Sequence, residues 1–269
     1  MNLEELRTHV KNNNNHCVIK DLDARPYREH EALSQSSLLR LNSSTMHFFQ
    51  DSAESDAMRL GSAIHLALLQ PDEYVKQVKE QPEFNLRTKD GKAEKAKFLA
   101  LNHDKIILDS DEAEIVRGIV ESVGSIKTAS SILKSGDVEV SAFAEIDGFH
   151  VKARMDILHK TCPIIFDIKT TSDCSAREFT KSIVDYGYDV QGALYCDVME
   201  KITGQPHGFG ILAVEKKPPY TFSVYQLDDV FIEYGRRGYR SLIEKYKETV
   251  LKGKLIDTLA APDWIQYRR

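Results

Sequence analysis

The stretch DVEVSAFAEIDGFHVKARMDIL, residues 137–158, decides the fold of this chain. Residues 137–146 and 149–158 each alternate in part between apolar and polar side chains, which is typical of strands. Asp147-Gly148, which lies between the two runs, is a turn signal for a β-hairpin. We therefore predict two antiparallel strands joined by a tight turn.

The segments on either side of this hairpin complete an α/β pattern. Residues 163–169, PIIFDIK, form an apolar run that predicts a strand at the centre of a sheet. Further segments are expected in this order: helices over 34–41, 57–70 and 111–134 (with a break near Gly124), then helices over 175–184 and 189–202, strands over 208–215 and 220–227, and a helix over about 229–251. This order predicts a mixed α/β (α+β) fold, with a central mixed β-sheet flanked by helices and a helical N-terminal part.

Composition limits the class of protein without naming it. The chain has 269 residues, of which 42% are hydrophobic and 29% charged, which suits one large globular domain or two small ones. These values exclude collagen, low-complexity chains and disulfide scaffolds. The formal net charge of -5 argues weakly against non-specific binding of polyanions. It does not exclude an enzyme of nucleic acids, because a carboxylate cluster that holds divalent cations attracts phosphate.

The sequence also indicates a cytoplasmic protein. Its four cysteines, Cys17, Cys162, Cys174 and Cys196, lie far apart without a C-x-x-C pair, so we expect reduced thiols. No apolar run approaches the roughly 20 residues that span a bilayer. The first 16 residues, MNLEELRTHVKNNNNH, lack the apolar core of a signal peptide, so we expect neither secretion nor membrane insertion.

Two aspartates and a lysine carry the candidate chemistry. Asp156 lies near the end of one predicted strand, and Asp167 lies on the next. Lys169 shares the face of Asp167, because side chains alternate along a strand. If the strands are neighbours, the carboxylates converge at one sheet end and form an oxygen site suited to Mg²⁺. The lysine would orient or deprotonate a water and offset charge in the transition state of phosphodiester hydrolysis.

Context makes this triplet more specific than similar ones. Asp90-Gly91-Lys92 lies in a polar turn, and the triplet at 215–217 lacks an acidic partner on an upstream hairpin. The alternative for Asp167 and Lys169 is a surface ion pair on an edge strand. The sequence leaves both interpretations open when the triplet is taken alone.

Four further residues accompany the triplet, each with a structural alternative. His65 lies on an apolar helix beside small residues, where it is either a core histidine or a metal ligand. Gln191 and Tyr195 are four residues apart and share a helix face, either for packing or for the site. Glu139 on the first hairpin strand either faces solvent or joins the same site.

Taken together, these motifs resemble a known nuclease family. The resemblance lies in four stretches of the sequence: GSAIHLALLQPDEY (61–74), RMDIL (154–158), FDIKTT (166–171) and YDVQGALYCD (188–197). A further similarity lies in PEFNLRTKDGK (82–92). They resemble the RecB-like branch of the PD-(D/E)XK nucleases and, more narrowly, nuclease domains of the exonuclease VIII (RecE) type. The resemblance runs from about residue 27 to the end. It implies a single nuclease domain over 1–269, with residues 1–26 as a short N-terminal extension.

The resemblance implies a role for each motif residue. It makes His65, Asp156, Asp167 and the backbone carbonyl of Ile168 ligands of Mg²⁺, for which Mn²⁺ could substitute, and it assigns the attacking water to Lys169. Further catalytic residues that it implies are Glu139, Gln191 and Tyr195, of which the last two also contact DNA. The second acid is Asp167 where many members of the superfamily have glutamate, and RecE-type proteins share this aspartate.

The same resemblance implies an activity and partners. The activity is 5′-to-3′ degradation of linear double-stranded DNA with free ends to mononucleotides, which leaves 3′ single-stranded tails for recombination by strand annealing. The implied partners are further copies of the chain in a ring-shaped homo-oligomer, a tetramer, and a single-strand annealing protein of the RecT type in phage or prophage recombination.

Basic residues near the metal site are candidate DNA contacts. Lys152 and Arg154 lie on the strand of Asp156 and, by alternation, share its face, where they would bind phosphate. Ser36 and Arg40, at an expected helix start with Ser34 and Ser37, are candidates for a 5′-phosphate pocket. Residues 87–97 are basic and would form a solvated loop or helix start. Such contacts predict little sequence specificity and strong salt dependence.

Other classes fit the sequence less well. An iron–sulfur nuclease of the same superfamily needs clustered cysteines, which this chain lacks. No Walker-A motif and no P-C-x-x-C element of the zinc deaminases occur. The alternatives that stay open are a RecB-like nuclease of different polarity and a non-catalytic DNA-binding scaffold on a degenerate nuclease fold.

Overall fold

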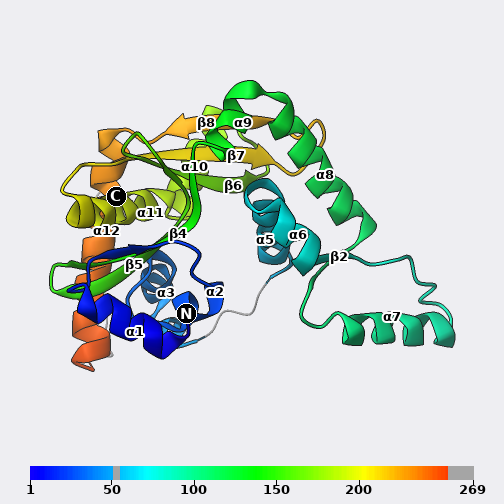
Figure 1. Cartoon of the computed structure of the whole chain (residues 1–269), viewed down its shortest axis with the longest axis horizontal. Helices are drawn as coiled ribbons and strands as arrows, with labels where there is room; N and C mark the ends of the chain where they lie inside the picture. The colour runs from blue at the N-terminus through cyan, green and yellow to red at the C-terminus, as the bar shows by residue number, and fades with distance from the viewer. Residues whose placement is uncertain (51–54, 254–269) are drawn as a thin grey trace, which may run out of the picture.

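A six-stranded mixed sheet forms the centre of the molecule (Figure 1). The computed structural model describes residues 1–50 and 55–253. In spatial order the strands are β1 (Cys17–Ile19), β4 (Gly136–Ile146), β5 (Phe149–His159), β6 (Ile164–Thr171), β7 (Gly208–Glu215) and β8 (Phe222–Gln226). Neighbouring strands are antiparallel except β6 and β7, which run parallel. The mixed sheet predicted from the sequence is therefore confirmed.

The hairpin that decides the fold forms as expected. Asp147 and Gly148 join β4 to β5 with φ values of 53° and 82°. Two consecutive positive φ values are typical of the type I′ turn, whose twist matches that of the strands it joins. The turn therefore fixes the register, in which Ile146 pairs with Phe149.

Two hydrophobic clusters join the sheet to its helices. The first cluster lies under α11 (Tyr188–Thr203), α10 (Ala176–Asp185), α12 (Asp229–Tyr246) and α3 (Gln35–Ser43), and it buries Leu194 and Phe209. The second lies under α5 (Asp56–Leu69), α8 (Ser110–Ser125) and α9 (Lys127–Leu133), and it buries Ile64 and Leu212. Apolar burial on both faces is the main stabilising contribution to such a layered fold.

Helix boundaries agree with the sequence except in detail. The expected break near Gly124 lies two residues later, at Ile126 between α8 and α9. The last helix is α-helical to Tyr246 and continues as a π-helical turn, η1 (Lys247–Leu251). Pro71 ends α5 as expected, but it also occupies the first turn of α6 (Pro71–Gln77). Proline is tolerated there because that N–H has no helical partner.

The N-terminal part adds an edge strand to the sheet. After α1 (Leu3–Asn12), β1 pairs antiparallel with β4, so that Cys17 lies opposite Phe143. α2 (Ala24–Glu29) and the short α4 (Thr45–Phe48) complete this part. A small cluster that includes Leu6 and Phe143 is buried between α1 and β4. Residues 1–26 thus pack against the sheet rather than standing apart from it.

A helical arm projects from the body. β2 (Val78–Glu80) and β3 (Ile106–Leu108) form a separate parallel pair, and α7 (Lys89–Leu101) lies between them in sequence. Residues 87–97, expected as a basic loop or helix start, belong largely to this helix, which Thr88 caps. Figure 1 shows α7 far from the central sheet. Within residues 1–50 and 55–253, no helix is long and apolar enough to cross a membrane.

Candidate active site

The site lies where β5 and β6 separate. These strands pair at Ile157–Phe166 and Leu158–Ile165. In the same register the next opposite positions are Asp156 and Asp167, just beyond the last pair. The two carboxylates therefore lie at the opening between the strands, as the sequence predicted for neighbouring strands.

A backbone distortion in β4 adds a third carboxylate. Glu139 lies opposite Asp156 and has a φ of 52°, a left-handed value that is strained for a residue with a side chain. The faces of the hairpin change here, because Met155 belongs to the cluster under α11 and Ile157 to the cluster under α5. Arg154 Nε donates to Glu139 Oε2 at 2.6 Å. This bond holds the glutamate at the site.

His65 reaches the carboxylates from α5. Its Nδ1 lies 3.3 Å from Asp156 Oδ2. One ligand atom each of His65, Glu139 and Asp156 lies within 4.8 Å of the others. Ligands at 2.0–2.6 Å from one cation lie roughly 3–5 Å apart, so this set has the spacing and the donor chemistry of a divalent metal site.

The pKa values of the site are pushed apart by burial and by neighbouring charge. Burial lowers the pKa of His65, but the Asp156 carboxylate outweighs this effect and raises that pKa to about 9. Burial raises the pKa of Asp156, but the facing His65 lowers it by more, so the pKa lies below its usual value. Burial and the Asp156 charge raise the pKa of Asp167 to about 6. Titratable groups perturbed in this way are characteristic of functional sites.

Two side chains fix the orientation of Asp167. Gln191 Nε2 donates to Asp167 Oδ1 at 2.6 Å, and Lys169 Nζ lies 2.6 Å from Asp167 Oδ2. The ammonium also lies 4.8 Å from the centroid of the Tyr188 ring. Burial lowers the pKa of Lys169, but the Asp167 carboxylate outweighs it and the pKa is raised. Lys169 is therefore a positively charged donor before any cation binds.

The backbone of β6 also contributes to the opening. Ile168 N donates to Asp156 Oδ2 at 2.7 Å. The N–H and C=O of one strand residue point to the same edge of the strand. The Ile168 carbonyl therefore points toward β5 and the opening, while its role as a ligand stays a prediction.

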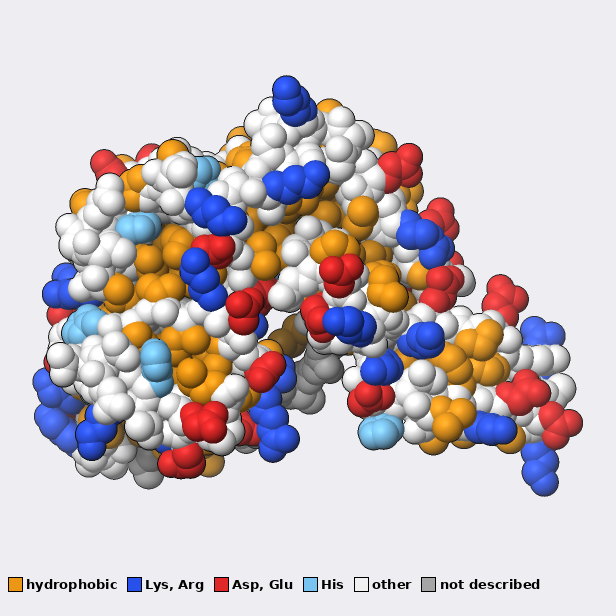
Figure 2. Space-filling view, viewed as in Figure 1, with side chains coloured by type: hydrophobic (Ala, Val, Ile, Leu, Met, Phe, Trp, Pro, Cys, Tyr) orange, Lys and Arg blue, Asp and Glu red, His pale blue; other side chains and the backbone are white. Residues whose placement is uncertain are grey.

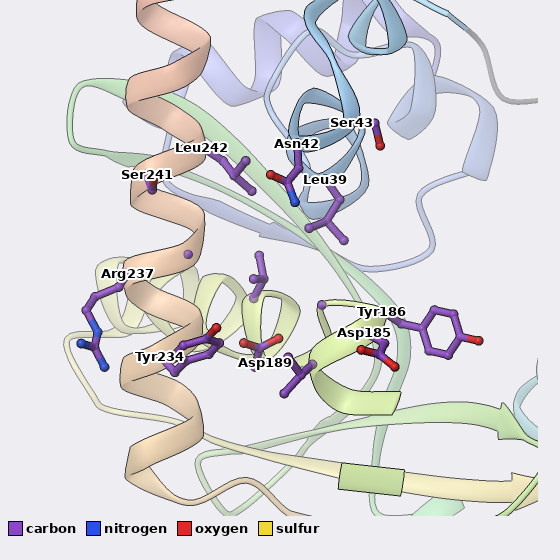
Figure 3. Close-up of a pocket in the computed structure, with 14 residues that line it drawn as sticks. Leu39, Asn42, Ser43, Asp185, Tyr186, Asp189, Tyr234, Arg237, Ser241 and Leu242 are labelled. Atoms are coloured by element: carbon purple, nitrogen blue, oxygen red, sulfur yellow. The ribbon is translucent and has the colours of Figure 1, made fainter. Parts of the chain in front are cut away.

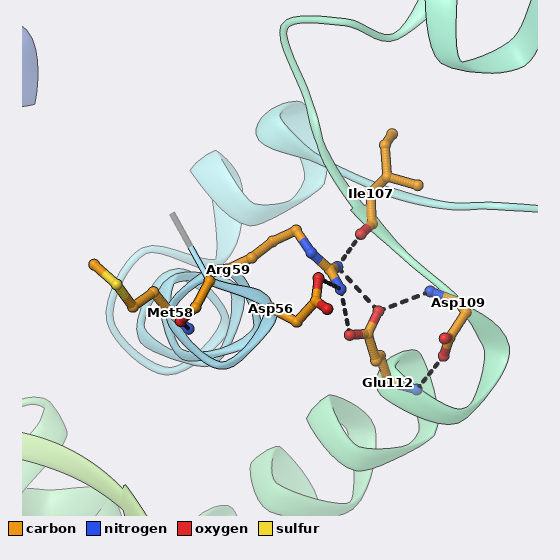
Figure 4. Close-up of polar contacts among 7 residues, drawn as sticks. Asp56, Met58, Arg59, Ile107, Asp109 and Glu112 are labelled. Carbon is orange, nitrogen blue, oxygen red and sulfur yellow. Dashed lines mark hydrogen bonds and ion pairs between the residues drawn. The ribbon is translucent and has the colours of Figure 1, made fainter. Parts of the chain in front are cut away.

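An ion-pair network anchors the helix that carries His65 (Figure 4). Arg59 on α5 forms two hydrogen bonds to Glu112 of α8, at 2.5 and 2.9 Å, and also donates to the carbonyl of Ile107 in β3. Arg59 and Glu112 are partly buried, so this paired geometry is worth more than an exposed ion pair. No motif in the sequence indicates this network.

Lys152 is placed differently from its prediction. Its Nζ donates to the carbonyls of Tyr27, Arg28 and His30 at 2.6, 3.2 and 2.6 Å, and the residue is 4% exposed. All three N–H groups of the ammonium are occupied, which leaves none for a phosphate. The prediction that Lys152 shares a face with Asp156 assumed that side chains alternate regularly along the strand. The backbone distortion at Glu139 interrupts this alternation in the hairpin.

The remaining candidates line one cavity beside the site. This cavity of about 810 Å³ is lined by Ser36, Arg40, Arg154 and Tyr195, among others. Ser34 caps α3, and its hydroxyl group is hydrogen-bonded to those of Ser36 and Ser37. Arg40 Nε is buried without a hydrogen-bond partner among the described residues. The serines and bases predicted for a phosphate pocket thus lie together.

These features define the class of protein. A hairpin that presents an aspartate, followed by a strand with aspartate and lysine at an opening in the sheet, is the arrangement of the PD-(D/E)XK nuclease fold. Residues 34–255 match the profile of a family described as "PDDEXK-like domain of unknown function (DUF3799)". The chain belongs to this family, and it carries a nuclease fold consistent with a RecE-like domain.

Solved structures agree on the fold. The structure of a candidate exonuclease from Eubacterium rectale aligns with this chain with a TM-score of 0.65 and 15% sequence identity. The alignment covers 93% of this chain and 94% of the exonuclease. An alkaline exonuclease from Laribacter hongkongensis has a TM-score of only 0.26 and 10% identity, with 83% of this chain and 91% of that chain covered. Comparison with curated proteins finds no match. The first similarity establishes the fold alone.

Proposed function

We propose that this protein is a metal-dependent exodeoxyribonuclease that degrades linear double-stranded DNA from 5′ to 3′ into mononucleotides, leaving 3′ single-stranded tails. One observation carries the proposal: His65, Asp156 and Glu139 converge at the opening between β5 and β6, next to the Asp167–Lys169 pair. Phosphodiester hydrolysis by an activated water needs a cation site and a neighbouring positive donor.

Each residue of the site has a proposed role. His65, Asp156, Asp167 and the Ile168 carbonyl hold Mg²⁺ or Mn²⁺, and Glu139 joins them from β4. The cation supplies a Lewis acid beside the scissile phosphate. Lys169, whose pKa is raised, orients the attacking water as an ammonium and stabilises charge that develops on the phosphate.

Gln191 and Tyr195 support this chemistry from α11. Gln191 holds one oxygen of Asp167, so that the other stays turned toward Lys169. Tyr195 is 8% exposed and lines the cavity next to Arg154. We assign both to the orientation of catalytic groups, with Tyr195 and Arg154 at the wall that a DNA end would contact.

The proposed path of the DNA follows the basic side chains. Figure 2 shows a hollow between the N-terminal part and the arm that carries α7. Ser36 and Arg40 line the cavity on one side, and Lys92 and Lys97 are exposed on the arm. A terminal 5′-phosphate in the Ser36–Arg40 cavity would explain the proposed polarity, because it places the first phosphodiester near the metal site.

Assembly and location belong to the same proposal. The resemblance to RecE-type domains supports a ring-shaped homo-tetramer and a RecT-type annealing partner in recombination. The scattered cysteines support a cytoplasmic location. A ring around the duplex would keep the enzyme on one DNA molecule through many cleavage steps.

A single digestion experiment tests activity and polarity together. Linear duplex labelled at either the 5′ or the 3′ end is incubated with Mg²⁺, and a matched sample receives EDTA. We expect immediate release of the 5′ label as mononucleotide, late release of the 3′ label, and no release with EDTA. Early release of the 3′ label would contradict the proposed polarity and support digestion from 3′ to 5′. DNA that is bound but never shortened would contradict the proposed activity and support the non-catalytic scaffold.

A further inference from the structure

A second cavity lies on the other side of α11 from the catalytic residues. It has a volume of about 570 Å³ and is enclosed by α3, the turn between α10 and α11, and α12 (Figure 3). Leu39 and Asn42 line it from α3, Tyr234 and Leu242 from α12, and Asp189 from the first turn of α11. None of these residues has a role in the nuclease site.

Asp189 is the unusual residue of this cavity. It is 2% exposed, and its Oδ1 is buried without a hydrogen-bond partner among the described residues. Burial raises the pKa of this carboxyl group, and the neighbouring backbone N–H groups of Val190 and Asp189 offset that effect only in part. A buried carboxylate oxygen without a donor is costly, and proteins normally pair such an atom with a cation or a donor. Among the described residues, Oδ1 of Asp189 is an acceptor without a donor.

The cavity wall is acidic and apolar rather than basic. Asp185 adds a second carboxyl group to the lining, and Leu39 and Leu242 add apolar surface. Arg237 is the basic residue among the described lining residues, and Figure 3 shows its side chain directed away from Asp189. Tyr234 of α12 lines the same cavity as Asp189. A ligand of this site would therefore be a cation with an apolar part.

We propose that this cavity binds a guanidinium group on an apolar stem, either an arginine side chain of a protein or a free alkylguanidine. A guanidinium is planar and weakly hydrated, donates two parallel hydrogen bonds to one carboxylate, and stacks on aromatic rings. Asp189 provides the carboxylate, Tyr234 the ring, and Leu39 and Leu242 the surface for the stem.

Calorimetric titration with agmatine, a butyl chain that carries a guanidinium, tests the proposal on the full chain. Wild type should bind agmatine saturably, and Asp189→Asn should weaken binding at least about tenfold, since a hydrogen bond to a charged group is lost. Asp185→Asn is the matched control, because Asp185 is exposed in the same wall. Equal affinity of wild type and Asp189→Asn, or no saturable binding at millimolar agmatine, would overturn the proposal.

A second variant tests whether Asp189→Asn weakens agmatine binding only by disturbing α11. Asn42 is exposed at the wall formed by α3, so Asn42→Trp should obstruct the cavity without altering Asp189. We expect agmatine binding to weaken while the melting temperature stays within a few degrees of wild type. Unchanged agmatine affinity in a folded Asn42→Trp variant would contradict binding in this cavity.

The source of the guanidinium is resolved by two further titrations. Arg268 and Arg269 lie outside the described residues and carry the required group, so one probe is a peptide of residues 262–269. The other is the same peptide with both arginines replaced by alanine. Tighter binding of the arginine peptide than of agmatine supports a protein side chain, and binding of agmatine alone supports a free ligand. Equal binding of both peptides would contradict recognition of the guanidinium. None of these measurements depends on nuclease activity.

Discussion

Two buried places in this molecule hold charged side chains, and they differ in how completely the charged groups are hydrogen-bonded. In one, the Lys152 ammonium uses all three N–H groups on backbone carbonyls at the C-terminal end of α2. In the other, His65, Asp156, Asp167 and Lys169 share one opening, and their pKa values are displaced in different directions. A fully paired buried charge fixes structure. Several ionisable groups that shift one another's pKa retain capacity for a cation and for proton transfer.

The largest expected effect comes from removing a proposed metal ligand. Asp167→Asn should lower nucleotide release from linear duplex by roughly 10³-fold or more, because a cation stabilises the transition state by several kcal/mol. The fold should persist, since the substitution removes a buried charge whose ionisation is unfavourable. Acid-soluble nucleotides and thermal unfolding are measured together. A variant that is unfolded at room temperature would show that Asp167 is structural.

The second effect separates chemistry from binding. Lys169→Met should lower turnover by roughly 10²–10³-fold, the usual effect of losing one donor to developing charge. Its affinity for duplex DNA in Ca²⁺ should change little, because the lysine is largely buried beside Asp167 and Tyr188. Turnover near that of wild type would remove Lys169 from the proposed mechanism.

The third effect is a pH dependence of metal affinity. A protonated imidazole cannot bind a cation, and the pKa of His65 is about 9. Between about pH 6, the pKa of Asp167, and pH 9, Mn²⁺ affinity should therefore rise about tenfold per pH unit, with one proton released per ion. Titration calorimetry in buffers of different ionisation enthalpy counts these protons. His65→Gln should weaken binding and flatten the pH profile, and an equally steep profile in that variant would exclude His65 as the titrating group.

The smallest effect belongs to the fully paired cluster. Lys152→Met leaves three backbone carbonyls without their donor, so the free energy of unfolding should fall by about 1–3 kcal/mol. Nuclease turnover per folded molecule should stay near wild type. Denaturant unfolding and turnover are measured on the same preparation. A large loss of turnover with unchanged stability would instead support the DNA contact that the sequence suggested for Lys152.

Much of the fold could be predicted from local patterns. The hairpin turn at Asp147-Gly148, the apolar run of β6 and the cap at Ser34 are signals within a few residues, and each element forms. β1 could not be predicted in this way. It has three residues, too few to show alternation, and it forms because β4 offers an edge to pair with.

The site was predictable in its residues and less so in its geometry. Motif order pointed to His65, Asp156, Asp167 and Gln191, which the structure brings together, while their roles stay predictions. The contact between Arg154 and Glu139 was missed because it depends on the register of the hairpin, which places Glu139 diagonally across from Arg154. The placement of Lys152 on the carbonyls of α2 depends on a contact over more than a hundred residues, which no local pattern records.

The pairing of β1 with β4 has a consequence for how copies of this chain avoid sticking to one another. β4 has 11 residues, and Cys17–Ile19 cover part of its outer side by pairing with Ser141–Phe143. An uncovered strand of that length would present free N–H and C=O groups to any passing strand. A shortened chain that began at Tyr27 would therefore be prone to aggregate through this edge, even though every proposed catalytic side chain would still be present.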